Sequence, residues 1–305
     1  MATKYEKIST LARETTAEVA KNAAAWTNYL DTAARLYKYP FNEQVLIYAQ
    51  RPDATACASL ELWNEKMNCW VNKGAKGIAL IDEDSRKPRL KYVFDVSDVH
   101  KARRIGKDPN LWNMREEHQE IVLSQLEKTY GETDKEYPFE LRIKELSDRI
   151  AADYLDLYAE DLGYNAEGSS LEELDVQNRE IRLKETLSSS IAYTILSRCG
   201  ADVESIRDEL NFDYISDFNT LETVSVLGNA TTEMCKPVLV EIGRTINAFE
   251  RNQARNHAVE EYLDTYEKNL NLGLANTPDT DYNALKRENK NSKENTEGTA
   301  YETSV

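Results

Sequence analysis

The sequence has no apolar run approaching the roughly 20 residues that a helix needs to cross a bilayer. Its first residues, MATKYEKISTLARE, lack the apolar segment of a secretory signal. Cysteine is scarce: Cys57, Cys69, Cys199 and Cys235 are scattered without a CxxC pair, which favours free thiols in a reducing compartment. We therefore expect a cytoplasmic protein with no membrane partner.

Histidine is also scarce, and the residue patterns of common active sites are missing. His100, His118 and His257 are far apart in the sequence, and none lies in an HExxH motif, which argues against a zinc protease or another metal site. No GxSxG motif and no Cys/His pair with local context is present. We expect a protein without enzymatic activity, cofactor or metal.

What is abundant is negative charge, and it is unevenly distributed. The chain of 305 residues has a net charge of −16. Residues 1–104 hold 17 of the 38 Lys and Arg residues and 13 of the 54 Asp and Glu residues, a net charge of +4, which leaves −20 for the remainder. The first part can accept a polyanion, whereas the second part repels one, unless the second part itself imitates a polyanion.

The first hundred residues predict three helices. Apolar residues at near-helical spacing indicate helices over residues 4–38 and 43–51, and a third from Ser59 to about residue 67. Pro40 ends the first of these, because the residue before a proline is biased away from helix. Asn42 is placed to cap the second.

The spacing of apolar residues then changes to that of strands. Short apolar runs at 70–71, 78–81 and 90–96 predict a three-stranded antiparallel meander, packed on the helices in a unit of about 100 residues. Gly74 lies in the turn between the first two runs, where glycine permits positive φ.

The rest of the chain predicts helices alone. They cover residues 111–130, 138–162, 170–199, 219–228 and 236–270. Ser170 and Asn219 are predicted N-terminal caps, and Pro237 fits the first turn of the last helix. The expected fold is α+β and mostly α-helical, with an α+β domain at 1–104, an acidic helical domain at 105–275 and a disordered polar tail at 276–305.

Two features of the first domain bear on nucleic acid. Lys73 and Lys76 flank Gly74 in a turn that can meet a phosphate, although a β-turn with solvated lysines is the simpler interpretation and no Walker A motif is present. Seven aromatic rings lie near these cations, and single-strand binders combine such rings with basic grooves. We expect roughly two of the seven to be exposed, and Trp63 and Trp70 to be in the core. The seven are Tyr37, Tyr39, Phe41, Tyr48, Trp63, Trp70 and Tyr92.

Several short segments of residues 39–96 follow one another in a specific order. They are Pro40-Phe41-Asn42, Leu46 to Thr55, Trp63-Asn64, Val71 to Ile78 and Val93 to Val96. In this order the region resembles the N-terminal domain of ArdC-type antirestriction proteins, found at the start of large mobile-element proteins of clostridia-like bacteria. The metalloprotease-like domain that usually follows has no HExxH counterpart in this chain.

The resemblance implies binding of single-stranded DNA and protection of incoming DNA from host restriction. Carried onto this sequence, the expected nucleic-acid contacts are Tyr39, Asn42, Gln50, Arg51, Lys73, Lys76, Arg89 and Lys91. The expected partner is single-stranded DNA.

Two other functions stay open. The acidic helical half can imitate DNA phosphates and inhibit a host restriction or CRISPR nuclease, as anti-CRISPR proteins do, although many soluble bacterial proteins are simply acidic. The chain can also be a scaffold domain of a larger polypeptide without an activity of its own.

Overall fold

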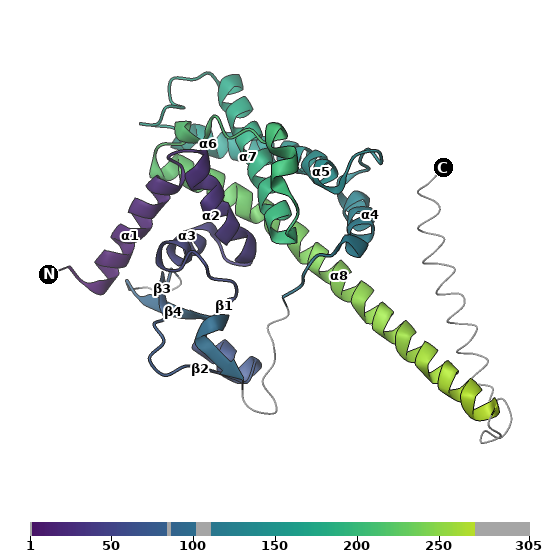
Figure 1. Cartoon of the computed structure of the whole chain (residues 1–305). Coiled ribbons are helices and arrows are strands. Elements are labelled where there is room, and N and C mark those ends of the chain that lie inside the picture. The colour runs from purple at the N-terminus through teal and green to yellow at the C-terminus, as the bar shows by residue number, and fades with distance from the viewer. Residues whose placement is uncertain (1, 84–86, 102–110, 272–305) are drawn as a thin grey trace. The chain divides into compact units, whose positions relative to one another are not determined.

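The computed structural model describes residues 2–83, 87–101 and 111–271 (Figure 1). The chain divides into two compact units, Met1–Ile242 and Gly243–Val305. The predicted domain boundary at residue 104 and the predicted tail at 276–305 lie outside the described residues. The α+β, mostly helical fold class is confirmed.

The N-terminal segment forms two helices where one was predicted. Helix α1, Lys4–Val19, begins with a capping box between Thr3 and Glu6. Helix α2, Ala23–Arg35, begins at a separate cap, where the Asn22 side chain accepts a hydrogen bond from the Ala25 N–H at 2.9 Å. The prediction of a single helix over 4–38 was wrong because the alanine-rich sequence continues across this break.

Helix α3, Phe41–Gln50, follows Pro40 and packs on α1 and α2. The predicted cap at Asn42 was wrong, because the helix begins one residue earlier and Pro40 occupies the capping position. The Asn42 Oδ1 atom instead accepts a hydrogen bond from the N–H of its neighbour Glu43 at 2.8 Å.

Two small antiparallel sheets replace the predicted meander. Strands β1, Cys57–Ser59, β3, Ile78–Ile81, and β4, Leu90–Asp95, form the first sheet in the order β1-β4-β3. Strand β2, Cys69–Val71, pairs with β5, Val99–Lys101, in a separate ribbon. The sheet of three strands is confirmed, but the run at 70–71 is not part of it. The predicted third helix is a short helical segment over residues 60–66 that includes a π-helical turn, Leu62–Lys66, and the Ser59 hydroxyl accepts a hydrogen bond from the Leu62 N–H at 3.3 Å, as expected of its cap.

Among the described residues, five α-helices follow the sheets, and the first four are α4, Gln119–Tyr130, α5, Phe139–Asp153, α6, Leu155–Asn165, and α7, Val176–Cys199. Asp175 caps α7 by accepting a hydrogen bond from the Asn178 N–H at 2.9 Å. Ser170 and Asn219, the predicted caps, bond to each other instead, with the Asn219 Nδ2 atom 2.7 Å from the Ser170 hydroxyl. Short 3-10 turns lie at Val96–Asp98, Glu116–His118, Val203–Glu209 and Ile215–Asp217.

Helix α8, Leu221–Asn271, is continuous where two helices were predicted. It begins in the first compact unit and continues into the second. Pro237 lies inside α8 and not in a first turn, as predicted, because its neighbours Val238 and Leu239 are fully buried and packing there outweighs the lost hydrogen bond. Gly228 permits close approach of α3, since a Cβ atom there would lie 2.2 Å from the Phe41 ring.

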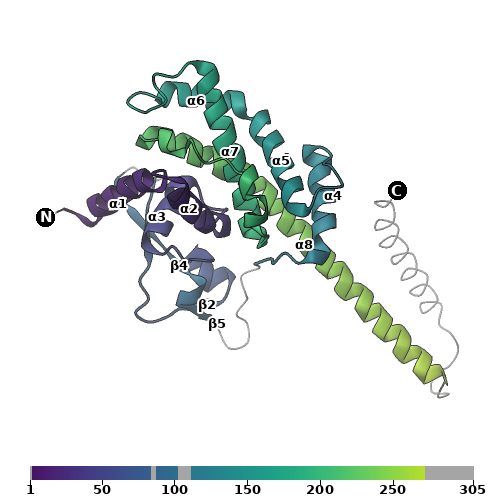
Figure 2. The same ribbon diagram turned by 45° about the horizontal axis from the view of Figure 1, so that its top comes forward.

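The core of the first unit centres on α7, which packs against both α2 and α5. Both views place α7 between these two helices (Figure 1, Figure 2). Trp26 of α2 is fully buried, and its indole N–H donates to the Ser190 hydroxyl of α7 at 2.8 Å. The helices of the first hundred residues and the later helices therefore share one core.

A buried ion cluster joins α4 to α5. The Arg142 Nη2 atom donates to the Glu127 carboxylate at 2.8 Å, and Lys135 and the Thr133 hydroxyl bond to the same carboxylate. Burial alone raises the pKa of Glu127, but these hydrogen bonds outweigh it and lower the pKa to about 2. Glu127 is therefore ionised throughout the physiological pH range.

Candidate functional site

Gln50 is engaged within the fold. Its Nε2 atom donates to the Ala79 carbonyl at 2.9 Å, and its Oε1 atom accepts from the Ala79 N–H at 2.9 Å. Because β3 lies at an edge of its sheet, this side-chain amide pairs with backbone groups that have no neighbouring strand. Because the Gln50 amide already uses its hydrogen-bonding groups on the sheet edge, it has few left for a nucleic acid.

Arg51 is neutralised by an acidic neighbour. Its Nη1 atom lies 2.5 Å from the Asp98 carboxylate, and this hydrogen bond raises the pKa of Arg51. Asp95 lies in the same turn and accepts hydrogen bonds from the Thr55 and Ala56 N–H groups at 2.8 and 3.0 Å. A phosphate would have to compete with Asp98 for the guanidinium, so Arg51 supports the fold of this turn.

Two other predicted contacts also face carboxylates. The Asn42 Nδ2 atom donates to Glu83 at 2.5 Å, and the Lys91 ammonium lies 2.7 Å from Glu43. These pairs bring Asn42 and Lys91 into one locality with acidic side chains. The Asn42 amide is neutral and already donates to Glu83, and Glu43 largely neutralises the positive charge of Lys91.

The remaining predicted residues divide into one half-buried ring and three exposed cations. Tyr39 is half-buried, and its hydroxyl donates to the Cys57 carbonyl at 2.8 Å. Lys73, Lys76 and Arg89 are exposed. Neither Lys73 nor Lys76 forms an ion pair with any residue that the structure describes.

An exposed indole lies on strand β2, which leads into the loop that carries Lys73 and Lys76. Trp70 is 51% exposed, although the sequence predicted it in the core, and it pairs across the β2–β5 ribbon with His100. Residues opposite each other in adjacent strands project from the same face, so both rings share one surface. The His100 Nδ1 atom lies 2.7 Å from the Asn72 side-chain oxygen. We call Trp70, Asn72, Lys73, Lys76 and His100 the Trp70 surface.

The alternation of strand β2 explains why Trp70 faces outward. Cys69 is buried and Val71 is half-buried, and both pack in a cluster around Trp63. Side chains in a strand alternate between faces, so the residue between them points away from that cluster. The alternation in Cys69-Trp70-Val71 could have predicted the outward direction of Trp70, but its large apolar side chain favoured a core position instead.

Of the seven rings considered, two are exposed, as predicted. Besides Trp70, the second is Tyr92 of β4, which is 38% exposed. The Lys4 ammonium lies over the Tyr92 ring, 4.7 Å from its centre. Trp63 is buried, as predicted, and its indole N–H donates to the Phe94 carbonyl at 2.9 Å.

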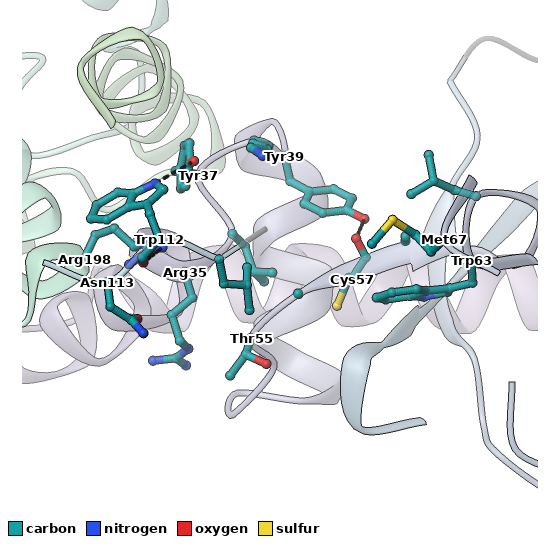
Figure 3. A pocket seen from close by; sticks show the side chains of 16 residues that line it. Arg35, Tyr37, Tyr39, Thr55, Cys57, Trp63, Met67, Trp112, Asn113 and Arg198 are labelled. Atoms are coloured by element: carbon teal, nitrogen blue, oxygen red, sulfur yellow. Dashed lines mark hydrogen bonds between the residues drawn. The ribbon is translucent and has the colours of Figure 1, made fainter. Parts of the chain in front are cut away.

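A pocket of about 440 Å³ opens elsewhere in the first unit. It lies between the C-terminal end of α2, the segment 36–39, strand β1, the π-helical turn, residues 111–113 and α7 (Figure 3). The cationic side chains Arg35, Lys38 and Arg198 line it, and none of its described lining residues is acidic. Tyr39 is the one predicted contact residue in this pocket.

The described lining residues of the pocket include one cysteine, Cys57. Burial raises the pKa of the Cys57 thiol to about 12, so this cysteine is a neutral thiol at physiological pH. No histidine lines the pocket to act as a base for it. Cys57 is therefore not an activated nucleophile.

Across residues 2–83, 87–101 and 111–271, no group of three or more His, Cys, Asp or Glu side chains is arranged to hold a metal ion. Within the same ranges, every helix is too short or too polar to cross a bilayer.

Comparisons with protein-family models, with curated proteins and with solved structures found no match to this chain.

Proposed function

We propose that this chain is a non-enzymatic mobile-element protein that binds single-stranded DNA through the Trp70 surface and counters host restriction. The observation that carries this proposal is an indole 51% exposed, on the same ribbon that leads into two lysines without a carboxylate partner among the described residues. An exposed ring and unneutralised cations are the two elements of sequence-independent single-strand binding.

The surrounding charge supports the same proposal. Residues 1–104 carry a net charge of +4 in a chain of −16, so a DNA strand is attracted to this part of the chain. The Trp70 ring supplies a stacking platform, while Lys73 and Lys76 contact neighbouring phosphates. The order of segments that resembles ArdC-type proteins is the basis for assigning the binding to antirestriction.

The proposal predicts how binding changes when each element is removed. Trp70→Ala weakens binding to a fluorescein-labelled oligothymidylate by about 1–3 kcal/mol, the cost of one stacked base. Lys73→Gln with Lys76→Gln lowers the slope of log K against log salt by about 1.4, because two phosphate contacts are lost. Both are measured by fluorescence anisotropy at several salt concentrations.

Matched controls separate the surface from general effects of charge and aromatic content. Lys7→Gln with Lys236→Gln removes the same charge from exposed positions of α1 and α8, and Tyr164→Ala removes a ring that is 79% exposed on α6. These variants keep the parent affinity and salt slope. If the parent has no measurable affinity at low salt, or if the controls weaken binding as much as the Trp70 surface variants, the proposal fails.

An acidic stretch that includes α6 supports the second candidate, a protein inhibitor that imitates DNA. Between residues 150 and 178 the chain carries eight carboxylates and no Lys or Arg, and all eight are exposed. They are Asp153, Asp156, Glu160, Asp161, Glu167, Glu172, Glu173 and Asp175. Exposed Tyr154, Leu157 and Tyr164 lie among them and add apolar contact area.

Such a surface fits the basic cleft of a nuclease of host defence. The test is co-elution with purified restriction or CRISPR nucleases, with duplex DNA as competitor. Binding that DNA displaces and that Asp156→Asn with Glu160→Gln weakens would support mimicry. Co-elution that DNA leaves unchanged would count against it.

A further inference from the structure

The pocket lined by Arg35, Lys38 and Arg198 has an unusual charge for this protein. Across the chain acidic residues outnumber basic ones by 54 to 38, yet the described lining residues include three cations and no carboxylate. Neither Arg35 nor Lys38 forms an ion pair with a described residue. The interior of the pocket is therefore electropositive within an acidic protein.

Arg198 is the centre of this positive charge. Its guanidinium lies over the Trp112 indole, 3.6 Å from the ring centre, and its Nη2 atom donates to the Trp112 carbonyl at 2.8 Å. Burial lowers the pKa of Arg198. A partly buried guanidinium with one hydrogen bond has further N–H donors available for an anion.

The other two cations add to this end of the pocket in different ways. Arg35 uses its donors on the Ala54 and Pro52 carbonyls at 2.9 and 2.6 Å, so it contributes charge more than hydrogen bonds. Lys38 is exposed, and its ammonium lies 5.7 Å from the centre of the Tyr37 ring. A bound anion would therefore meet Arg198 from inside and Lys38 from the rim.

The other end of the pocket is apolar. In Figure 3, Trp112 and Arg198 lie at one side, Trp63 and Met67 at the opposite side, and the Tyr39 ring between them. The Tyr39 hydroxyl is already bonded to the Cys57 carbonyl, so this ring presents its apolar body. A flat ring suits these aromatic walls, and a volume of about 440 Å³ is within the range of small-ligand sites.

We propose that this pocket binds a small anion joined to a planar ring, of the class of nucleoside monophosphates, with the phosphate at Arg198 and the base near Tyr39 and Trp63. Such a ligand matches the cationic end, the aromatic end and the volume together. This chemistry is shared by a free nucleotide and by the 5′-phosphorylated end of a DNA strand. The site is separate from the Trp70 surface and uses different residues.

Isothermal titration calorimetry of the full chain with thymidine 5′-monophosphate, thymidine and inorganic phosphate tests the proposal. We expect a Kd below about 1 mM for the nucleotide, and affinity for the uncharged thymidine at least about tenfold weaker. Arg198→Gln weakens nucleotide binding by about tenfold or more, because a charge-assisted hydrogen bond is lost. Arg207→Gln, at an exposed position of the turn after α7, leaves it unchanged.

A second variant keeps the test decisive if Arg198→Gln fails to fold, as judged by circular dichroism. Lys38→Glu alters only the exposed rim and also weakens nucleotide binding by reversing a charge there. Phosphorylated and unphosphorylated tetrathymidylates distinguish the two sources. Arg198-dependent preference for the phosphorylated strand identifies a strand end, whereas tight binding of the mononucleotide alone identifies a free nucleotide, and either result supports the shared chemistry.

The proposal is overturned if the nucleotide shows no binding at about 10 mM, if thymidine binds equally well, or if both folded pocket variants bind like the parent. Its failure is distinct from that of the proposed function. Trp70→Ala leaves nucleotide affinity unchanged, and Arg198→Gln leaves affinity for an unphosphorylated oligonucleotide unchanged.

Discussion

The Gln50 side chain pairs with the edge strand β3 of the three-stranded sheet, and replacing Gln50 tests whether it has a structural role or contacts DNA. Its amide both donates to and accepts from Ala79, with each distance 2.9 Å, so it imitates the backbone of a neighbouring strand. Ala79 is only 2% exposed. In Gln50→Leu, the N–H and C=O groups of Ala79 both lose their partner and gain little water in exchange.

The magnitude follows from these two backbone groups. An unsatisfied buried polar group costs about 1–3 kcal/mol, so Gln50→Leu should lower the free energy of unfolding by about 2–4 kcal/mol. For a unit of this size that corresponds to a fall in Tm of roughly 5–10 °C. Gln50→Glu still accepts from the Ala79 N–H but repels the carbonyl, and its stability should be intermediate.

The assay is urea unfolding followed by circular dichroism, with Gln177→Leu at an exposed position of α7 as the matched control. The folded Gln50→Leu protein should keep the parent affinity for oligothymidylate. The reasoning is refuted if Gln50→Leu unfolds within about 0.5 kcal/mol of the parent. It is refuted equally if the folded variant loses DNA affinity, since Gln50 would then contact DNA as the sequence predicted.

Two more predictions concern the helical part of the first unit. Because the pKa of Glu127 is lowered from 4.5 to about 2, its contribution to stability is fully present above pH 4.5 and is lost as the pH falls towards 2. The parent should lose about 3 kcal/mol across this window, and Glu127→Gln should show a flatter decline when unfolding is measured against pH. An equal pH dependence of unfolding in the parent and Glu127→Gln would contradict a stabilising role of the Glu127 cluster. At Gly228, a methyl group would lie 2.2 Å from the Phe41 ring, so Gly228→Ala should cost about 1–3 kcal/mol. Gly163→Ala in α6, with no atom within 4 Å of the new methyl group, should instead gain up to about 1 kcal/mol, and equal effects at both sites would show that α3 does not pack closely on α8.

The sequence was informative about the fold where local signals act alone. Pro40 separates α2 from α3, although α2 already ends at Arg35, and the shift in spacing near Trp70 marks the strands. The predicted α+β, mostly helical class is confirmed. The break at Asn22 was missed because alanines on both sides favour helix equally. The opposite error occurred at Pro237, where burial of the surrounding helix outweighs the local preference against proline.

The candidate sites depend on contacts between residues that are distant in the sequence. Lys91 is neutralised by Glu43, and Arg51 by Asp98, so cations that look available in the sequence are already paired. Lys38 and Arg198 line the same pocket, and local spacing in the sequence gives no sign of this. By contrast, the outward direction of Trp70 follows from strand alternation and could have been predicted from the sequence.

Site-mapped photocrosslinking tests the central claim, that single-stranded DNA lies on the Trp70 surface, most directly. An oligonucleotide carrying bromodeoxyuridine is bound to the full chain at low salt, irradiated and digested, and the crosslinked peptides are identified by mass spectrometry. We predict crosslinks at Trp70 and His100 that disappear in Trp70→Ala with Lys73→Gln and Lys76→Gln. Crosslinks confined to α6 or α8, or a yield unchanged in that variant, would contradict the account.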